Sequence, residues 1–319
     1  MGIFKFIIRR ILFGLLTMFV VATVVFLLTQ VVRDPAKAIL GRDGTGDQLI
    51  AKRKELGLDR PKFEQYWTWL TDLVFHQKAP KSFTNKLGMW EFLGDRIENS
   101  VFLMFACTLI SIPLSIIVGA VAARRRDRTF DSVTSGVNLF LAGTPEYVLG
   151  IALLFLFSTN VWHIFPGTVR IRPGQAPWVD LKQLVLPVMT LVLAVVPYVS
   201  RTMRASTVEV LESDYVEMAR LKGVSEGTVL WRHALPNAIG PTLQVIAINI
   251  AYLVAGVITV EALFNYPGVG LAMRDAVLGH DAATVQFIAL FISSIYVIVN
   301  LLADVGTILV TPRLRTTIR

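Results

Sequence analysis

Six long apolar stretches constrain the fold of this chain more than any other feature of its sequence. They lie at residues 11–32, 101–123, 133–158, 184–203, 238–264 and 284–310. Each stretch is long enough for a helix to cross the hydrocarbon core of a bilayer, which takes about 20 residues. The sequence therefore predicts an all-α membrane protein with six transmembrane helices.

The composition agrees with a protein that spans a membrane. Of the 319 residues, 54% are hydrophobic and 17% are charged, whereas soluble domains carry about 25% charged residues. The first apolar stretch follows Lys5, Arg9 and Arg10, as the apolar part of a signal peptide does. It is longer than such a part and no small-x-small cleavage pattern follows it, so we expect a retained helix. The single cysteine, Cys107, excludes an intrachain disulfide.

The distribution of Lys and Arg residues predicts the orientation of the helices. Fifteen of the 31 lie at the N-terminus, in the loop after the second stretch, at 201–232 and in the C-terminal tail. The short loops on the other side hold only Arg170, Arg172, Lys182 and Arg274. Long loops such as 33–96 escape the positive-inside rule, which places basic residues in the cytoplasm. We therefore predict that both termini are cytoplasmic and that the long first loop is extracytoplasmic. Since the same rule accounts for the net charge of +8, we expect no nucleic-acid partner.

A polar segment at 214–237, DYVEMARLKGVSEGTVLWRHALPN, separates the fourth and fifth apolar stretches. We expect two short helices joined by a turn. Gly223 suits the end of the first helix, since glycine adopts the left-handed conformation at low cost. Pro236 marks the point where the following helix must begin. A compact polar segment on the cytoplasmic side indicates a docking surface for a soluble partner.

This segment resembles the EAA loop of ABC-importer permeases. The resemblance rests on Glu217-Met218-Ala219, then Gly223, then His233-Ala234-Leu235-Pro236. Met218 stands where that family usually has alanine.

Other motifs, in the right order along nearly the whole chain, resemble the DppB/OppB type of permease, the dipeptide, oligopeptide and nickel branch. They are Leu-Gly-Leu-Asp-Arg-Pro at 56–61, residues 204–216, Asn-Tyr-Pro-Gly-Val-Gly at 265–270, residues 300–304 and Pro-Arg-Leu-Arg at 312–315. Two positions depart from the pattern: Thr311 replaces an acidic residue, and 279–282 lacks an Arg-Asp-Tyr-like turn.

The resemblance implies a type I ABC-importer permease fold and a place in the bacterial inner membrane. It implies a first transmembrane helix with a long extracytoplasmic loop at 1–94, a permease core at 95–310 and a cytoplasmic tail at 311–319. The permease would form half of a translocation pathway. Its partners would be two cytoplasmic ATPase subunits, a second permease that is similar rather than identical, and an extracytoplasmic solute-binding protein.

The chain itself is expected to be non-catalytic. It lacks the Gly-x-x-x-x-Gly-Lys-Ser/Thr loop that cradles phosphates. We expect no cofactor and no metal site in this chain, and ATP and Mg²⁺ would bind to the partner ATPases.

The candidate docking residues lie in the 214–237 segment. They are Asp214, Glu217, Ala219, Arg220, Gly223, His233 and Pro236. We expect the helix at 216–222 to enter a groove of the ATPase, with Glu217 making a charged contact there. The alternative for Glu217 is an ordinary solvated helix face. His233 is expected to be a structural hydrogen-bonding residue of the loop.

Polar residues inside the apolar stretches are candidates for the solute pathway, because a polar group facing lipid is costly. Asn138, Glu146 and Asn249 are the candidates to line the pathway, although a structural role is favoured for most such residues. Glu146, after Pro145, could instead bind backbone groups that the proline frees. Glu261 and Asp304, near the ends of stretches, are expected to be structural and to pair with Arg201 or Arg274.

Several alternatives remain open from the sequence. The same permease fold carries nickel or oligosaccharides in relatives of this branch, besides peptides. A secondary transporter would not need the 214–237 segment, and no residue pattern favours a membrane enzyme. In the first loop, the aromatic residues Tyr66, Trp67 and Trp69 indicate either an interfacial belt or a docking surface for an external partner.

Overall fold

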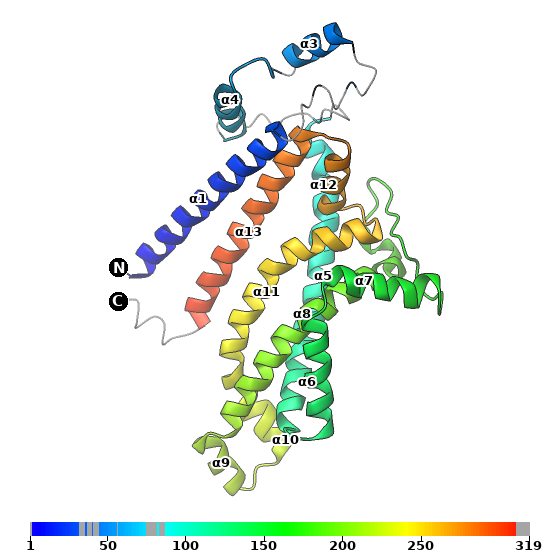
Figure 1. Cartoon of the computed structure of the whole chain (residues 1–319). Coiled ribbons are helices and arrows are strands. Elements are labelled where there is room, and N and C mark those ends of the chain that lie inside the picture. Colours follow the sequence, from blue (N-terminus) through cyan, green and yellow to red (C-terminus); the bar gives the residue numbers. More distant parts are fainter. Residues whose placement is uncertain are drawn as a thin grey trace.

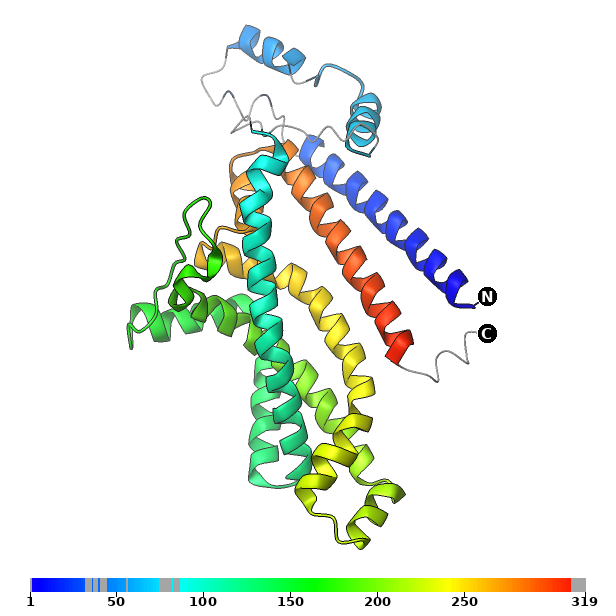
Figure 2. The same ribbon diagram turned by 180° about the vertical axis from the view of Figure 1, so that it is seen from behind.

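The computed structural model describes residues 2–31, 36, 40, 45–55, 57–74, 82 and 87–310. Throughout these residues the regular elements are helices (Figures 1 and 2). The tail predicted at 311–319 lies outside the described residues, as do residues 41–44 and several of their neighbours in the first loop.

Among the described residues, five uninterrupted helical stretches are long and apolar enough to cross a membrane. They are Lys5–Thr29 in α1 (Gly2–Val31), Met89–Arg124 (α5), Pro177–Leu211 (η2 and α8), Glu226–Phe264 (α10, η3 and α11) and Ala282–Gly306 in α13 (Ala282–Val310). A sixth crossing is formed by a bent pair, Thr129–Ala142 and Glu146–Thr159. The prediction of six membrane crossings is confirmed when this pair counts as one.

The prediction of one continuous helix at 133–158 is wrong. The chain forms α6 (Thr129–Ala142), then α7 (Glu146–Leu154) and the π-helical turn η1 (Phe155–Thr159), with a bend of 104° between the two halves. Figure 1 shows α7 running across the bundle rather than along it. Pro145 explains the break, because proline has no N–H to donate and disfavours helical geometry in the residue before it.

The helices α5, α8 (Leu181–Leu211) and α11 (Leu235–Phe264) form the core of the bundle. Small residues let their backbones approach closely, as is common for helices in membranes. At Gly119 of α5, a Cβ atom would lie 2.6 Å from the carbonyl oxygen of Ser200 in α8. This contact holds α5 and α8 together near the end of the bundle that carries α9.

The first and last helices form a separate pair beside the core. α1 and α13 lie side by side in both views (Figures 1 and 2), and the Arg10 Nε lies 3.0 Å from a carboxylate oxygen of Asp304. The expectation that Asp304 pairs with Arg201 or Arg274 is therefore wrong, because the antiparallel packing of α1 brings Arg10 to it first.

Glu261 is also held by partners other than those expected. It is fully buried near the end of α11, where it accepts hydrogen bonds from the Ser100 hydroxyl at 2.5 Å and the Gly270 N–H at 2.6 Å. The turn after α11 adds a bond of 2.7 Å from the Tyr266 hydroxyl to the carbonyl of Asn99. Burial, and then the nearby Glu261, raises the pKa of Tyr266, so the hydroxyl stays a donor. These bonds fix α12 (Val269–Leu278) against α5.

Two short helices, α3 (Gly46–Glu55) and α4 (Lys62–Val74), belong to the long first loop. Two of its aromatic residues pack on α1: the Tyr66 and Trp69 rings lie 5.2 and 5.7 Å from the ring of Phe26. Trp67 stays exposed. Tyr66 and Trp69 therefore hold α4 to the end of α1.

Candidate functional site

The 214–237 segment folds into one short helix followed by the start of a long one. α9 (Asp214–Leu221) begins after Ser213, whose extended backbone starts the helix. Gly223 ends it in the left-handed conformation, with φ of +79°, as the sequence predicts. The expected second helix is α10 (Glu226–Thr228), but it does not stop. It continues through the π-helical turn η3 (Val229–Ala234) into α11, with Pro236 in the first turn of α11.

Side chains tie α9 back to the ends of both neighbouring helices. The Arg220 guanidinium donates to Glu226 at 2.9 Å and to the carbonyl of Leu211, the last residue of α8, at 3.2 Å. On the other side, the Tyr215 hydroxyl donates to the His233 carbonyl at 3.3 Å. α9 is thereby attached to α8 and to the helix that becomes α11.

One face of α9 is directed inward and the opposite face is open. Val216 is fully buried, beside the buried Val229, Leu230 and Ala234 of η3. The open face consists of Asp214, Glu217, Met218 and Leu221, which share one side of a helix by their spacing. In the described part of the chain, neither carboxylate of this face has a hydrogen-bond or ion-pair partner.

The expected docking residues therefore divide into two groups. Asp214 and Glu217 point outward, and Ala219 is half-buried on the flank of α9. Arg220, Gly223 and His233 shape the segment itself, and His233 does so through its backbone carbonyl, which accepts from Tyr215 and Asn237.

The sequence reasoning did not find the supporting residues Tyr215 and Glu226. For Glu226, the one available signal is its position six residues after Arg220, on the other side of a glycine turn.

A basic turn lies at the same end of the bundle. Residues 124–128 connect α5 to α6, and Arg126 pairs with Glu212 just before α9. Between α8 and α6, Arg204 pairs with the buried Asp131 at 2.5 Å. The two predicted cytoplasmic features, the basic turn and the 214–237 segment, thus share one end of the molecule.

Exposed residues of α11 and α8 form two stripes that differ from a surface facing lipid. In α11, exposed residues recur every three or four positions: Asn237, Pro241, Gln244, Ile248, Tyr252 and Ala255. In α8 they are Tyr198, Arg201, Ala205 and Glu209. By contrast, α5 exposes Val101, Phe105, Leu109, Leu114 and Ile117, all apolar. We call the first two sets the polar stripes. Six of these ten residues are polar, and polar groups in the membrane usually face cavities or partners, so the polar stripes are candidates for a face that meets a partner or a pathway.

The three expected pathway residues differ in their surroundings. Asn138 is 6% exposed and donates to the Ser200 hydroxyl at 3.0 Å, and Asn249 is 8% exposed and donates to the carbonyl of Val245 in its own helix. Glu146 is half-buried and accepts a bond from the Tyr252 hydroxyl at 3.4 Å. Glu146 therefore lies beside a polar stripe, whereas both asparagines are enclosed between helices.

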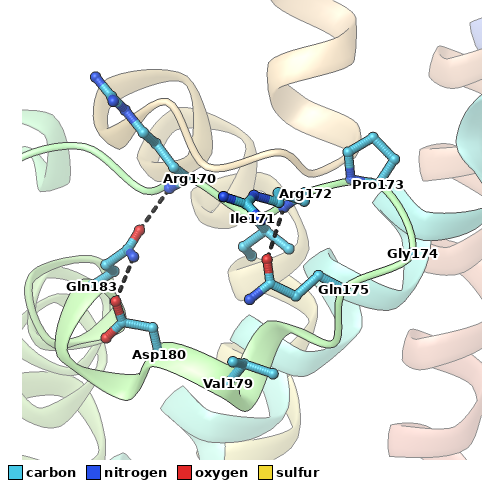
Figure 3. Close-up of a pocket in the computed structure, with 9 residues that line it drawn as sticks. All are labelled: Arg170, Ile171, Arg172, Pro173, Gly174, Gln175, Val179, Asp180 and Gln183. Atoms are coloured by element: carbon cyan, nitrogen blue, oxygen red, sulfur yellow. Dashed lines mark hydrogen bonds between the residues drawn. The ribbon is translucent and has the colours of Figure 1, made fainter.

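A cavity lies at the opposite end of α8, beside the exposed side chains of Arg170 and Arg172. We call the loop that carries these two arginines the cation-bearing loop. The cavity has a volume of about 730 Å³ and lies in the loop before α8, between Arg170 and Gln183 (Figure 3). Gln183 and Gln175 side chains accept bonds from the backbone N–H groups of Arg170 and Arg172, at 2.7 and 3.2 Å. Figure 3 shows the Arg170 side chain extending away from Asp180 and Gln183. The loop is thus held by its own polar groups while both guanidinium groups remain accessible.

Comparison with known families decides what this arrangement is. Residues 111–316 match the model of the binding-protein-dependent transport system inner membrane component, and residues 3–104 match the model of its N-terminal part. The chain belongs to this family. It is a permease subunit of an ABC transporter with the type I importer fold, and it is a multi-pass protein of the bacterial inner membrane. The resemblance read from the sequence is confirmed.

Relatives align over almost their full length. A protein of Sinorhizobium fredii named as a peptide ABC transporter permease is 32% identical over 99% of this chain and 100% of its own. A peptide transport system permease protein of Brucella abortus is 34% identical over 97% of this chain and 98% of its own. The nickel import system permease protein of Staphylococcus aureus is 30% identical over 99% of this chain and 93% of its own.

Membership in the family also defines the kinds of partner. A binding-protein-dependent permease works with ATPase subunits and a solute-binding protein. The open face of α9 and the loop that carries Arg170 and Arg172 lie at opposite ends of α8.

Proposed function

We propose that this permease subunit imports peptides, pairs with a second, similar permease, and is driven by two ATPase subunits that dock on α9. The observation that carries the proposal is the open face of α9. It presents two carboxylates that have no partner among the described residues beside exposed Met218 and Leu221, while the rest of the helix is fastened to the bundle. Apolar side chains with charges at their rim are typical of a protein interface.

The attachment of α9 gives the subunit a way to transmit movement. α9 bonds to the end of α8 through Arg220 and to η3 through Tyr215. The span Glu226–Phe264 is one helical stretch of 39 residues. When the ATPases close on ATP, displacement of α9 would move α8 and α11 together. Both helices carry the polar stripes, so the pathway would open to one side or the other as a two-state change.

The chemistry of ATP hydrolysis is assigned to the partners. We propose that this chain binds neither ATP nor Mg²⁺ and needs no cofactor, because its sequence has no phosphate-binding loop. Its part is to form half of the pathway and to respond to nucleotide through α9.

We further propose that the α9 end faces the cytoplasm, with both termini on that side. The positive-inside rule supports this, since the basic turn at 124–128 lies at the same end as α9. The solute-binding protein would then dock at the other end, where Arg170 and Arg172 offer positive charge to an acidic surface.

Peptide is favoured over nickel as the solute by the relatives and by the pathway. Peptide permeases are among the relatives with 32% and 34% identity, against 30% for the nickel permease. The polar stripes bear single polar residues spread along two helices, which suits a wide path with little selection of its own.

The decisive experiment is affinity purification of the chain from its native membrane in mild detergent, followed by mass spectrometry. We expect ATPase subunits, a second permease and a solute-binding protein, and a peptide bound to that last protein. Recovery of nickel on the binding protein would replace the peptide assignment. Recovery of the chain alone, or only with copies of itself, would contradict the proposed assembly with ATPases on α9.

A further inference from the structure

The bend between α6 and α7 holds a carboxylate at the depth of the membrane interior. Glu146 is the first residue of α7, and its nearest hydroxyl belongs to Tyr252 of α11. Tyr252 lies about 25 Å along the helix from Leu235 and about 18 Å from Phe264, at 1.5 Å of rise per residue. A carboxylate at this depth is costly unless it faces a cavity or a partner.

Glu146 has fewer partners than the three acidic residues that are buried or paired between helices. Asp131 pairs with Arg204, Asp304 pairs with Arg10, and Glu261 accepts two hydrogen bonds. Glu146 accepts a single long bond of 3.4 Å, and no ion pair forms to it within the described residues. Glu98 and Glu209 also lack a partner among the described residues, but both are exposed, whereas Glu146 is half-buried between α7 and α11.

The surrounding helices are shaped to admit this carboxylate. Gly256 of α11 faces it so closely that a Cβ atom there would lie 2.8 Å from the Glu146 Oε2. Tyr198 of α8 meets the other side of the bend, where its hydroxyl donates to the Ala142 carbonyl at 3.2 Å. We call Glu146, Tyr198 and Tyr252 the Glu146 cluster. The two tyrosines are 44% and 48% exposed and belong to the polar stripes, so the cluster opens onto the pathway.

The chemistry of the cluster suits an ammonium group. A carboxylate accepts strong, charge-assisted hydrogen bonds from N–H donors, and the faces of tyrosine rings attract cations. A divalent metal would require several oxygen or nitrogen ligands arranged around it, and the cluster offers one carboxylate. One turn further along α8, the exposed Arg201 has no ion-pair partner within the described residues. The negative charge of Glu146 followed by the positive charge of Arg201 suits a zwitterion, such as a peptide with both termini free, better than a bare cation.

We propose that Glu146 binds the protonated N-terminal amino group of the peptide during its passage, with Tyr198 and Tyr252 on either side. The inference rests on the proposed function, because it takes a peptide as the solute. It assigns a binding group to a pathway that otherwise offers little selectivity.

The test uses the assembled importer in lipid nanodiscs and a photoreactive tripeptide, alanyl-photoleucyl-alanine, with its amino group free or acetylated. After irradiation, labelled residues are mapped by mass spectrometry. We expect the free peptide to label the segments around 142–147, 198 and 252 about tenfold more than the acetylated one, since a charged hydrogen bond is lost. Glu146→Gln should remove this difference, and Tyr252→Phe should reduce it.

Three results would overturn the inference. They are equal labelling by the two peptides in the unmodified importer, no labelling of these segments, and an unchanged preference in Glu146→Gln. The first two need no variant and so do not depend on how a variant folds. Protection of the site by NiCl₂ at concentrations below those at which trialanine protects would also overturn it, in favour of a metal.

Controls separate this inference from the proposed function. Glu98→Gln makes the same change of charge at an exposed position of α5, and we expect it to keep the preference for the free amino group. Co-purification of ATPases and binding protein does not involve the tripeptide. Its failure would remove the proposed function, whereas intact co-purification without selective labelling would remove only the role of Glu146.

Discussion

The hydroxyl of Tyr215 donates a hydrogen bond to the backbone carbonyl of His233, eighteen residues further along the chain. The amide of Asn237 completes the arrangement, because it donates both to the Tyr215 hydroxyl at 3.1 Å and to the same carbonyl at 2.8 Å. One aromatic side chain thus connects the helix offered to a partner with the helix that enters the membrane. This connection makes the open face of α9 a part of the bundle rather than a loose loop.

The first prediction concerns the open face of α9. Leu221 is 74% exposed, and Leu221→Asp should lower recovery of the ATPase with the permease about tenfold or more, because it places a charge in an apolar contact. The measurement is pull-down of co-expressed ATPase. Leu278→Asp is the matched control, since Leu278 is 71% exposed at the other end of the molecule. Equal loss in both variants would show that Leu221 has no special role in docking.

The second prediction concerns the turn after α9. Gly223→Ala should destabilise the segment by about 1 kcal/mol, because its φ of +79° is unfavourable for a residue with a Cβ atom. Gly227→Ala is the control: it lies in α10 with ordinary helical geometry, and a Cβ atom at either glycine meets nothing within 4 Å. Hydrogen exchange of residues 214–224 measures the effect. Faster exchange in the second variant than in the first would contradict the assignment.

The third prediction concerns the cation-bearing loop. Arg170→Glu and Arg172→Glu together should greatly reduce stimulation of ATP hydrolysis by the solute-binding protein. Neutral Gln replacements should cause a smaller loss, because association between charged surfaces depends on their sign. Stimulation of the unmodified importer should fall as salt rises. If stimulation is the same in all variants and independent of salt, the binding protein docks elsewhere.

The fourth prediction concerns the buried Glu261. Glu261→Ala should destabilise the protein by about 3 kcal/mol, because the Ser100 hydroxyl and the Gly270 N–H would lose their buried acceptor. Thermal unfolding in detergent measures this change. Glu98→Ala removes an exposed glutamate from α5 and should change stability by less than about 0.5 kcal/mol. Similar melting of the two variants would show that the Glu261 bonds contribute little.

Much of the architecture is readable from the chain because the bilayer restricts what it can contain. Apolar length predicts the helices, and Gly223 predicts where α9 ends, but Pro236 lies inside a helical stretch that already begins at Glu226. The bend at 143–145 was missed, although Pro145 marks it, because prolines are often tolerated within membrane helices and the apolar run continues past the break.

Pairings between distant residues were harder to predict. Asp304 pairs with Arg10, 294 positions away, and nothing local in the sequence indicates that α1 lies along α13. Arg220 was expected to contact a partner, and the structure shows that it also holds the turn through Glu226. One sequence motif can therefore contain both residues that shape a surface and residues that present it.

The unbroken helix from Glu226 to Phe264 has a consequence for how such subunits diverge. Each residue of an α-helix advances the chain by about 100° around its axis. One residue inserted between α9 and the membrane would therefore swing the partner-facing surface by more than a quarter of a turn. The widened π-helical turn at Val229–Ala234 is where a single residue is accommodated with least disturbance. If an ATPase docks on α9 as proposed, a change of length between α9 and the membrane would therefore alter its angular position relative to the bundle, unless this π-helical turn absorbs the change.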